Sequence, residues 1–306
     1  MDNFSNLVYG FIGLGLMGGS FAKAIRAKLL AGPSATGKIL ALDSNKAALE
    51  AAVERGIVDE AFGKDAAASM VKCCDVVFIC LYPAKTIEFL KKYRDDFKSG
   101  SVVSDISGVK AGVIEALPEI LRDDVDFISG HPMAGNEKEG FYYSSGYIFE
   151  GRNYILIPHA ANKPENLAFF KALAGALGFS QITETDYASH DHKVAFTSQL
   201  CHVIASALVE SAEDTKISAF GGGSFEDLTR IAMINAPLWT ELFLANRGEL
   251  LRHIATFEAS LKRITALIDR ADGEGLCGYL EAVRLKRSAM SVTESTVSGK
   301  APHPQN

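Results

Sequence analysis

The sequence is poor in the residues that mark several classes of protein. Its 306 residues include five cysteines, nine prolines and one tryptophan. The cysteines are odd in number and lack metal-site spacing, so we expect neither a disulfide framework nor a metal site. No apolar run approaches the ~20 residues that span a bilayer. The first ten residues lack the basic start of a signal peptide, and we expect a cytoplasmic protein with reduced thiols.

Excess positive charge is also missing. The formal net charge is −6 and the sequence pI is about 5.7, which excludes an extended basic surface for nucleic acid or anionic lipid. Hydrophobic residues make up 48% of the chain, enough for a sizeable core, and its length suits about two domains. An anionic substrate would therefore need local arginines.

A glycine-rich turn near the N-terminus carries the first functional signal. Residues 8–12 predict a buried strand, residues 20–30 predict a helix, and Gly13, Gly15 and Gly18 between them have the spacing G-x-G-x-x-G. Such a turn presents phosphates to a helix N-terminus, where unpaired N–H groups and the helix dipole favour an anion. The alternative is an ordinary tight turn. The nucleotide-binding residues predicted here are Gly13, Leu14, Gly15, Met17 and Gly18.

An acidic residue follows the next predicted strand, residues 39–42. Asp43 stands where a carboxylate can accept both ribose hydroxyls of NAD, or alternatively cap the strand end. The interval from Gly18 exceeds the usual ~20 residues because residues 31–37 form a turn-rich insertion. No arginine follows Asp43, so a 2′-phosphate would have only Lys46 as compensation. We therefore predict NAD rather than NADP as the cofactor.

Alternating strands and helices continue this pattern. Residues 75–81 and 101–105 predict two more buried strands around a helix over residues 84–97, which is typical of a parallel, doubly wound sheet. Residues 127–129 and 154–157 are expected to extend that sheet. Ligands bind outside the carboxyl ends of such strands. The further cofactor contacts predicted are Ser44, Leu81, Tyr82 and Pro83, with residues 104–107 facing the same cleft.

After residue 186 the apolar periodicity becomes helical. One long stripe alternates steps of four and three and forms a heptad-like seam: Leu250, Ile254, Phe257, Leu261, Ile264 and Ile268. We expect its helix to begin after Asn235 as N-cap and to stop at residues 272–275. The seam needs a partner surface, so we predict a homodimer joined through a helical domain. Packing within one chain is the alternative.

Three motifs resemble the prephenate dehydrogenase (TyrA) family: residues 130–135 (Gly-His-Pro-Met-Ala-Gly), the glycine-rich segment 221–232, and Pro-Leu-Trp at 237–239. The resemblance runs to about Arg287. It implies NAD-dependent oxidative decarboxylation of prephenate to 4-hydroxyphenylpyruvate in tyrosine biosynthesis. It also implies an α/β Rossmann-like domain with a doubly wound parallel sheet, followed by an all-α dimerisation domain. We place the NAD-binding domain at residues 1–180, the helical substrate-binding domain at 181–290 and a disordered tail at 291–306.

The histidine in the first motif suits the chemistry that this resemblance implies. Removal of a hydride makes the prephenate ring electron-poor, and loss of CO2 makes it aromatic. His131, with an ordinary pKa of about 6.5, can accept the hydroxyl proton near neutral pH. By the resemblance it is the catalytic histidine, and a turn-capping histidine is the alternative. Ser107 is assigned to the same hydroxyl, although family members with serine one position later differ from this chain, which has Gly108.

Prephenate carries two carboxylates, so at least one fixed guanidinium is expected. The resemblance assigns Arg230 to this role, with Asp227 and Glu137 as a gate around it, or Asp227 as an ordinary surface partner. Many family members read Ser-His-Leu-Pro-His at residues 198–202, where this chain has glutamine and cysteine, so the choice between prephenate and arogenate stays open. The substrate-binding residues predicted are Arg230, Gln199, His202, Asn136, Glu137, Asp227 and Trp239.

Two other functions fit parts of the pattern. A β-hydroxyacid dehydrogenase needs a lysine base on the first long helix of the second domain, where Lys193 is the only candidate. A catalytically silent NAD-sensing dimer would fit the altered residues 198–202 but not the retained His131 and Arg230. Residues 190–192 (His-Asp-His) resemble metal ligands, yet no closing ligand set is apparent, which favours helix capping and domain packing.

Overall fold

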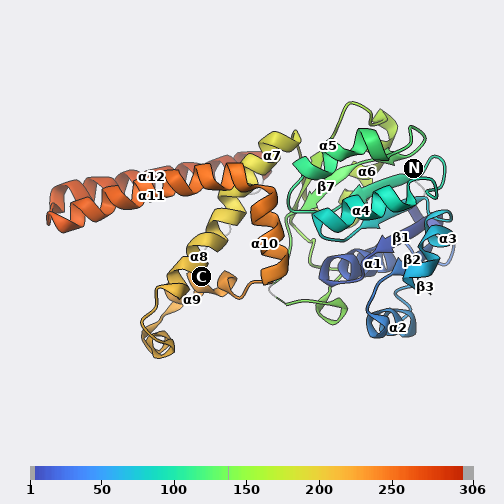
Figure 1. Ribbon diagram of the computed structural model, residues 1–306, viewed down its shortest axis with the longest axis horizontal. Coiled ribbons are helices and arrows are strands. Elements are labelled where there is room, and N and C mark those ends of the chain that lie inside the picture. The colour runs from blue at the N-terminus through green and yellow to red at the C-terminus, as the bar shows by residue number, and fades with distance from the viewer. Residues whose placement is uncertain (1–3, 137, 299–306) are drawn as a thin grey trace. The chain divides into compact units, whose positions relative to one another are not determined.

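The computed structural model describes the backbone of residues 4–136 and 138–298. It describes the side chains of residues 4–136 and 138–290. The chain divides into two compact units, residues 1–247 and 248–306 (Figure 1). The described strands all lie in the first unit. No helix of the described chain combines the length and apolar character needed to cross a membrane.

A sheet of six parallel strands is the centre of the first unit. Its strands are β1 (Val8–Ile12), β2 (Lys38–Leu42), β3 (Glu60–Phe62), β4 (Val76–Ile79), β5 (Val102–Asp105) and β6 (Asp126–Phe127). Their spatial order is β3-β2-β1-β4-β5-β6, so the chain reverses direction across the sheet between β1 and β4. The predicted doubly wound parallel sheet is confirmed. Ligands of such sheets bind where the strand order reverses.

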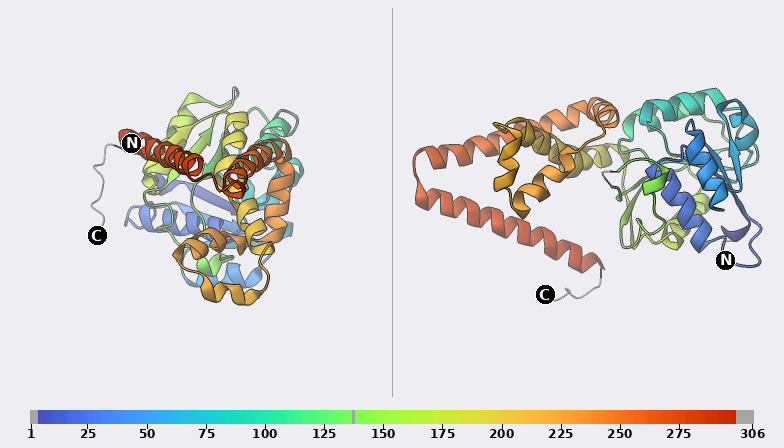
Figure 2. Two further views of the ribbon diagram at one scale, coloured as in Figure 1. Left: turned by 90° about the vertical axis from the view of Figure 1, so that its left-hand side faces the viewer. Right: turned by 90° about the horizontal axis from the view of Figure 1, so that it is seen from below.

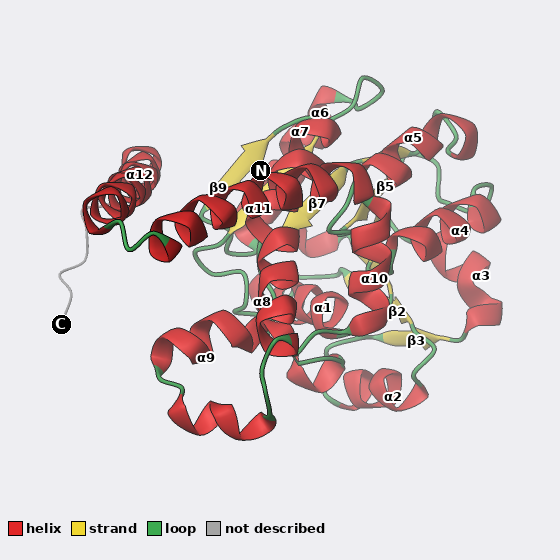
Figure 3. Ribbon diagram, turned by 60° about the vertical axis from the view of Figure 1, so that its left-hand side comes forward, coloured by secondary structure: helices red, strands yellow, loops and turns green. Residues whose placement is uncertain are grey.

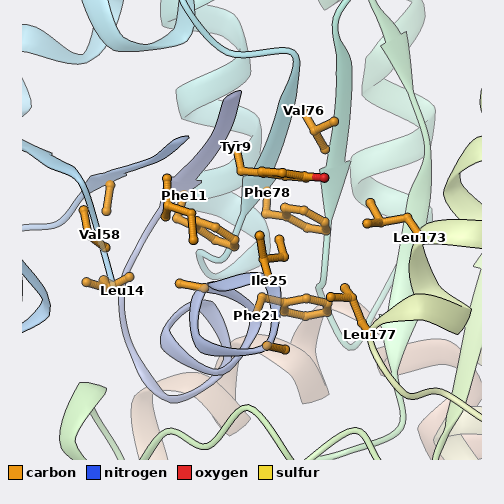
Figure 4. Packing of buried hydrophobic residues seen from close by; sticks show 14 of the residues in the cluster. Tyr9, Phe11, Leu14, Phe21, Ile25, Val58, Val76, Phe78, Leu173 and Leu177 are labelled. Carbon is orange, nitrogen blue, oxygen red and sulfur yellow. The ribbon is translucent and has the colours of Figure 1, made fainter. Parts of the chain in front are cut away.

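Apolar clusters cover the two faces of this sheet. Helices α1 (Leu16–Lys28), α2 (Lys46–Glu54) and α6 (Pro164–Ala176) contribute to one cluster. Helices α3 (Ala67–Val71), α4 (Pro83–Tyr93) and α5 (Ala111–Ile120) contribute to the other. Figure 4 shows Tyr9 and Phe11 of β1 on the first face with Phe21 and Phe78, whose ring centroids are 5.0 Å apart. Each such buried ring stabilises the fold by about 1.5–3 kcal/mol.

The prediction that residues 154–157 extend the central sheet is wrong. Strand β8 (Asn153–Ile157) belongs to a separate sheet, antiparallel to β7 (Ser129–Pro132) and parallel to β9 (Gln181–Glu184). The predicted strand over residues 127–129 is divided, since β6 ends at Phe127 and β7 begins at Ser129. A short apolar run predicts burial but does not name the neighbouring strand.

Helices follow β9 in the first unit. They are α7 (Tyr187–Val194), a π-helical turn (Ala195–Gln199), α8 (Leu200–Glu210), α9 (Gly223–Thr229) and α10 (Ala236–Ala245). Short 3₁₀ turns occupy Phe4–Asn6, Lys64–Ala66, Phe141–Tyr143, Thr215–Phe220 and Arg230–Ala232. In Figure 3, helices lie around the strands of the central sheet. The backbone N–H of Ala84 donates to Glu241 Oε1 at 2.6 Å, which ties the start of α4 to α10.

The predicted cap at Asn235 is confirmed, but it does not begin the seam helix. The Asn235 side chain accepts a hydrogen bond from Leu238 N at 2.9 Å and starts α10. The chain then breaks at Asn246, before α11 (Arg247–Asp269). Asn246 is buried and donates to Gln199 Oε1 at 2.9 Å and to Asp191 O at 2.8 Å. These two bonds pin the break, because a buried amide needs partners.

The second unit consists of α11 from Gly248 onward and α12 (Gly273–Ser298), which run in opposite directions from a turn (Figure 2). Large apolar side chains are exposed on both helices, including Phe257, Leu261, Ile268, Leu280, Val283 and Leu285. The backbone of α12 continues past residue 291, where we expected a disordered tail, since no glycine or proline interrupts the helix there before Gly299. The rest of that tail, residues 299–306, lies outside the described residues.

Candidate active site

A cleft of about 720 Å³ lies in the first unit, within the range of small-ligand pockets. Its wall combines the glycine turn after β1, the segments after β4 and β5, the turn after β7, and residues from α7 to α10. The predicted site residues that line it are Gly15, Met17, Gly18, Leu81, Tyr82, Pro83, Ser107, His131, Asn136, Gln199, His202, Arg230 and Trp239. The tertiary structure therefore brings the predicted cofactor, catalytic and substrate segments to one cavity.

The glycines of the turn have different physical roles. Gly13 has a φ of +96°, and a Cβ there would lie 2.7 Å from the carbonyl oxygen of Cys80. A Cβ on Gly18 would lie 2.1 Å from the carbonyl oxygen of Gly13. A Cβ on Gly15 would meet no described atom within 4 Å. Gly13 and Gly18 are thus required by the turn itself, whereas Gly15 leaves open space at the start of α1 that a phosphate can use.

The Asp43 carboxylate is held by two backbone groups. Its Oδ2 accepts a hydrogen bond from Leu14 N at 2.5 Å, and its Oδ1 accepts one from Asn45 N at 2.7 Å. Asp43 and Ser44 line a second hollow, together with Lys46. Both carboxylate oxygens retain lone pairs for further donors. This arrangement caps the strand end and also fits the residue to accept ribose hydroxyls.

We expect Gly18→Ala and Gly15→Ala to fail in different ways. The first should lower the thermal stability of the protein, because its Cβ would collide with the backbone at Gly13. The second should leave the melting temperature close to the parent's and weaken NAD binding, because its methyl group enters the space for a phosphate. Thermal unfolding and NAD titration would separate the two effects. Equal losses of stability in both variants would contradict this division of roles.

His131 begins a chain of hydrogen bonds that leads away from the cleft. Its Nδ1 lies 2.9 Å from Nε2 of His190, and Nδ1 of His190 lies 2.7 Å from Oδ1 of Asp191. The Asp191 carboxylate also accepts hydrogen bonds from the backbone N–H groups of Lys110 and Ala111, where α5 starts. The N-cap of α7 itself is Asp186, so Asp191 bonds the start of a different helix from the one that carries it. The contact of His190 with His131 was not predicted.

The surroundings of His131 favour its neutral form. Burial lowers its pKa well below the ordinary value of 6.5, and the nearby His190 and Lys110 lower it further. Lys110 is fully buried, and its Nζ donates to Asp105 Oδ2 at 2.8 Å and to Gly130 O at 2.5 Å. Burial lowers the pKa of Lys110 and the Asp105 carboxylate opposes that shift. At pH 7 the His131 imidazole is therefore neutral, and one of its nitrogens can accept a proton.

The hydroxyl of Ser107 is a buried polar group that lacks a hydrogen-bond partner within the described residues. Ser107 lines the cleft, and its backbone N–H donates to Asp105 Oδ2 at 3.1 Å. A Cβ on Gly108 would lie 3.9 Å from Cε1 of His131. Gly108 thus adjoins the imidazole, and Ser107, one position earlier, brings a hydroxyl to the wall of the same cleft.

Helices α8 and α10 form the opposite wall. The His202 ring stacks on Trp239 with a centroid separation of 3.5 Å, and its Nδ1 lies 3.0 Å from Ser198 O. A carbonyl only accepts, so Nδ1 carries the proton and Nε2 is an acceptor. Gln199 is buried, with its Nε2 donating to Leu242 O and its Oε1 accepting from Asn246. These bonds use the oxygen and one N–H group of the Gln199 amide.

The residues of the predicted gate occupy different places relative to the cleft, as far as the structure describes them. Arg230 lines the cleft at the start of a 3₁₀ turn, and Asn136 lines it from the segment after β7. Asp227 is exposed on α9 and is not among the residues that line the cleft. Glu137 lies outside the described residues. The arginine predicted to bind a substrate carboxylate, Arg230, therefore lies at the wall of the cleft.

The sequence placed Asp105 in a segment facing the cleft but did not indicate Lys110 or His190 as parts of the active site. Lys110 lies between a buried strand and α5 and is fully buried, which is rare for an unpaired lysine and here depends on Asp105. The sequence signal available was a charged pair five residues apart, Asp105 and Lys110, within an otherwise apolar and small-residue segment. The His-Asp-His run at residues 190–192 did mark His190, but it could not indicate the partner His131, which lies 59 positions away.

A turn that admits phosphates and a proton acceptor in the same cleft define the class: a nucleotide-dependent oxidoreductase. The chain matches the family model described as the nucleotide-binding domain of prephenate dehydrogenase over residues 21–180, and the one described as its dimerization domain over residues 186–282. It therefore belongs to the prephenate dehydrogenase family. The predicted fold class, an N-terminal α/β nucleotide-binding domain and then a helical dimerisation domain, is confirmed.

Proteins similar to this chain include prephenate dehydrogenases and an arogenate dehydrogenase. A prephenate dehydrogenase of Bacillus subtilis is 25% identical over 289 residues, 92% of this chain and 76% of the relative. The crystal structure of prephenate dehydrogenase from Aquifex aeolicus, in complex with hydroxyphenyl propionate and NAD+, has a TM-score of 0.82 and 30% identity and covers 93% of this chain and 98% of its own. Synechocystis arogenate dehydrogenase has a TM-score of 0.76 and 25% identity and covers 93% and 100%.

Proposed function

We propose that the protein is an NAD-dependent prephenate dehydrogenase that converts prephenate to 4-hydroxyphenylpyruvate and CO2 in cytoplasmic tyrosine biosynthesis. The observation that carries this proposal is a neutral imidazole, His131, in the same cleft as the partnerless Ser107 hydroxyl, at the carboxyl ends of the parallel strands. The similar Aquifex structure, with NAD+ and hydroxyphenyl propionate bound, supports the choice of ligands.

The residues of the cleft divide the reaction between them. Bound NAD supplies the acceptor for the hydride. His131 takes the hydroxyl proton as the C–H bond breaks, and the Ser107 hydroxyl holds the substrate oxygen in place by a hydrogen bond. Arg230 binds a substrate carboxylate through a charge-assisted contact. Loss of CO2 then makes the ring aromatic, and this gain drives the step. The protein therefore needs to position the hydride and to accept one proton.

The turn and Asp43 fit the cofactor. Gly15 leaves space for the pyrophosphate, the residues after β4 line the same cleft, and Asp43 keeps acceptor capacity for the ribose hydroxyls. We propose NAD rather than NADP because the Asp43 carboxylate would repel a 2′-phosphate placed next to it. The same hollow is lined by two lysines, Lys46 and Lys64, and by two further carboxylates, Glu50 and Glu54.

The test is direct. Purified protein with prephenate and NAD should form NADH, seen by its absorbance, and release CO2. Arogenate and NADP are run beside them, because an arogenate dehydrogenase is the second candidate: the related Synechocystis enzyme has that name, and Gln199 occupies a position where many family members have histidine. A clear preference for arogenate would select that candidate. No turnover with either substrate would favour the silent NAD-binding dimer.

Arg230→Gln is expected to raise KM for prephenate with a smaller change in kcat. Removal of a charge-assisted carboxylate contact costs about 1.5–3 kcal/mol, or roughly 10–150-fold in affinity. Steady-state kinetics would measure it, with Arg94→Gln as the matched control, because Arg94 is a half-exposed arginine of α4 outside the cleft. A KM that stays at the parent value would exclude Arg230 from carboxylate binding.

A further inference from the structure

We propose that His190 and Asp191 are positioning residues that fix the tautomer of His131, with its Nε2 left as the proton acceptor that serves the cleft. The inference rests on the proposed function only in using His131 as the base. It adds two consecutive residues of α7. They line no part of the cleft but decide which nitrogen of His131 carries a hydrogen.

The geometry is a continuous and shielded line of hydrogen bonds. His190 and Asp191 are both buried, 1% and 4% exposed, at the middle of α7. The two links are 2.7 Å between Asp191 Oδ1 and His190 Nδ1, and 2.9 Å between His190 Nε2 and His131 Nδ1. Both distances are normal for strong hydrogen bonds. His131 is the member of this line that borders the cleft.

The direction of the protons follows from the acceptor at the end of the line. Asp191 already accepts from the backbone N–H groups of Lys110 and Ala111, so its carboxylate is the acceptor form. Nδ1 of His190 must then carry a hydrogen. Neutral His190 consequently has a bare Nε2, which can only accept, and Nδ1 of His131 must donate to it. The remaining nitrogen of His131, Nε2, has a free lone pair.

Burial and the charge of Lys110 favour the neutral state of both rings, while the carboxylates of Asp191 and Asp105 oppose it at His190. His131 and His190 face Lys110 from the segment before α5 and Asp105 from β5, and Asp191 adjoins His190 on α7. Burial is the largest cause that lowers the pKa of His190, and the hydrogen bond to Asp191 partly offsets it. A second proton on either ring would also be opposed by the buried Lys110 ammonium.

Asp191→Asn is the most direct test because it keeps the shape of the side chain. It reverses the direction of the hydrogen bonds from residue 191 through His190 to His131. An amide oxygen at the Oδ2 position can still accept from Lys110 N and Ala111 N. The NH2 group at the Oδ1 position would donate to His190 Nδ1 and would lose the bond that Lys110 N makes to Oδ1. His190 would then donate from Nε2, and His131 would carry its hydrogen on Nε2. A wrong histidine tautomer costs about 10⁴-fold in kcat in the serine-protease triad, where the aspartate bonds the catalytic histidine directly.

His190 offers a matched pair of variants. In His190→Gln the side-chain oxygen can stand near the place of Nε2 and accept from His131 Nδ1, so kcat should stay within about tenfold of the parent's. In His190→Phe the ring volume is kept and the acceptor is lost, and kcat should fall about 10²-fold or more, the range for a general base. KM for prephenate should change little in either variant, because neither residue touches the substrate.

The decisive readout is nitrogen NMR of histidine-labelled protein, with the His131 signals assigned by their loss in His131→Asn. The parent should show hydrogen on Nδ1 of His131, and Asp191→Asn should show it on Nε2. Thermal unfolding and NAD titration of every variant identify simple misfolding. An unchanged tautomer in Asp191→Asn, or equal kcat losses in His190→Gln and His190→Phe, would overturn the proposal. A parent protein that has the predicted tautomer but turns over neither prephenate nor arogenate would instead refute the proposed function alone.

Discussion

Replacing His131 with asparagine is expected to lower kcat by about 10²–10⁴-fold, the range for loss of a general base, while KM for prephenate stays near the parent value. Asparagine keeps a polar side chain of smaller volume in strand β7 but cannot accept a proton near neutral pH. Steady-state kinetics of NADH formation would measure the change. The control is His192→Asn, since His192 is exposed on α7 and is not among the residues that line the cleft.

The pH dependence gives this prediction a second readout. The neutral imidazole is the active form, and the pKa of His131 lies well below 6.5. Lowering the pH to 6.5 should therefore cause no loss of kcat/KM through protonation of His131. Activity should fall only as the pH drops through that lowered pKa, and this acid limb should be absent from His131→Asn. Near-parental turnover of the variant at all pH values would leave His131 as a turn-capping residue.

Phe257→Asp combined with Leu261→Asp is expected to abolish a homodimer formed through the helical domain. Both side chains lie on α11 and are 36% and 52% exposed in a single chain. Burial against a partner would stabilise each by up to about 1.5–3 kcal/mol, which two carboxylates would replace with a desolvation penalty. Sedimentation should show a monomer or aggregates in place of the dimer. The match to a family model described as a dimerization domain supports this expectation.

A matched control separates the seam from added charge. Ala255→Asp with Ala259→Asp adds the same two charges at exposed positions of α11, and the helical period places both away from the Phe257 side. This variant should sediment like the parent. A parent protein that is monomeric and well folded at micromolar concentration would contradict the prediction outright.

Local signals predicted the nucleotide-binding half of the site well. Strand β1, the glycine turn and the start of α1 are consecutive in sequence, so their spacing alone specifies the turn, and the Gly13 φ of +96° accords with it. The N-cap at Asn235 is likewise a contact between residues three apart. Such features depend on backbone geometry within a few residues and therefore leave a readable pattern.

Pairing between distant segments left no such pattern. An apolar run in β8 predicted burial but not the second sheet, and the seam of α11 was predicted without the break at Asn246. Gln199 could be read as a cleft donor, whereas the fold engages its amide with α10 and Asn246. In each case the deciding partner is far away in the sequence.

The sequence by itself determined the class of the fold, the phosphate-binding turn and the presence of a histidine, a serine and an arginine suited to the chemistry, because these follow from residue type and short spacing. Only the tertiary structure decided which groups surround that histidine. His131 meets His190 across 59 positions, and Lys110 and Asp105 are buried together beside Gly130. The pKa and tautomer of an imidazole depend on burial and on partners within hydrogen-bond distance, and chain folding alone sets those distances.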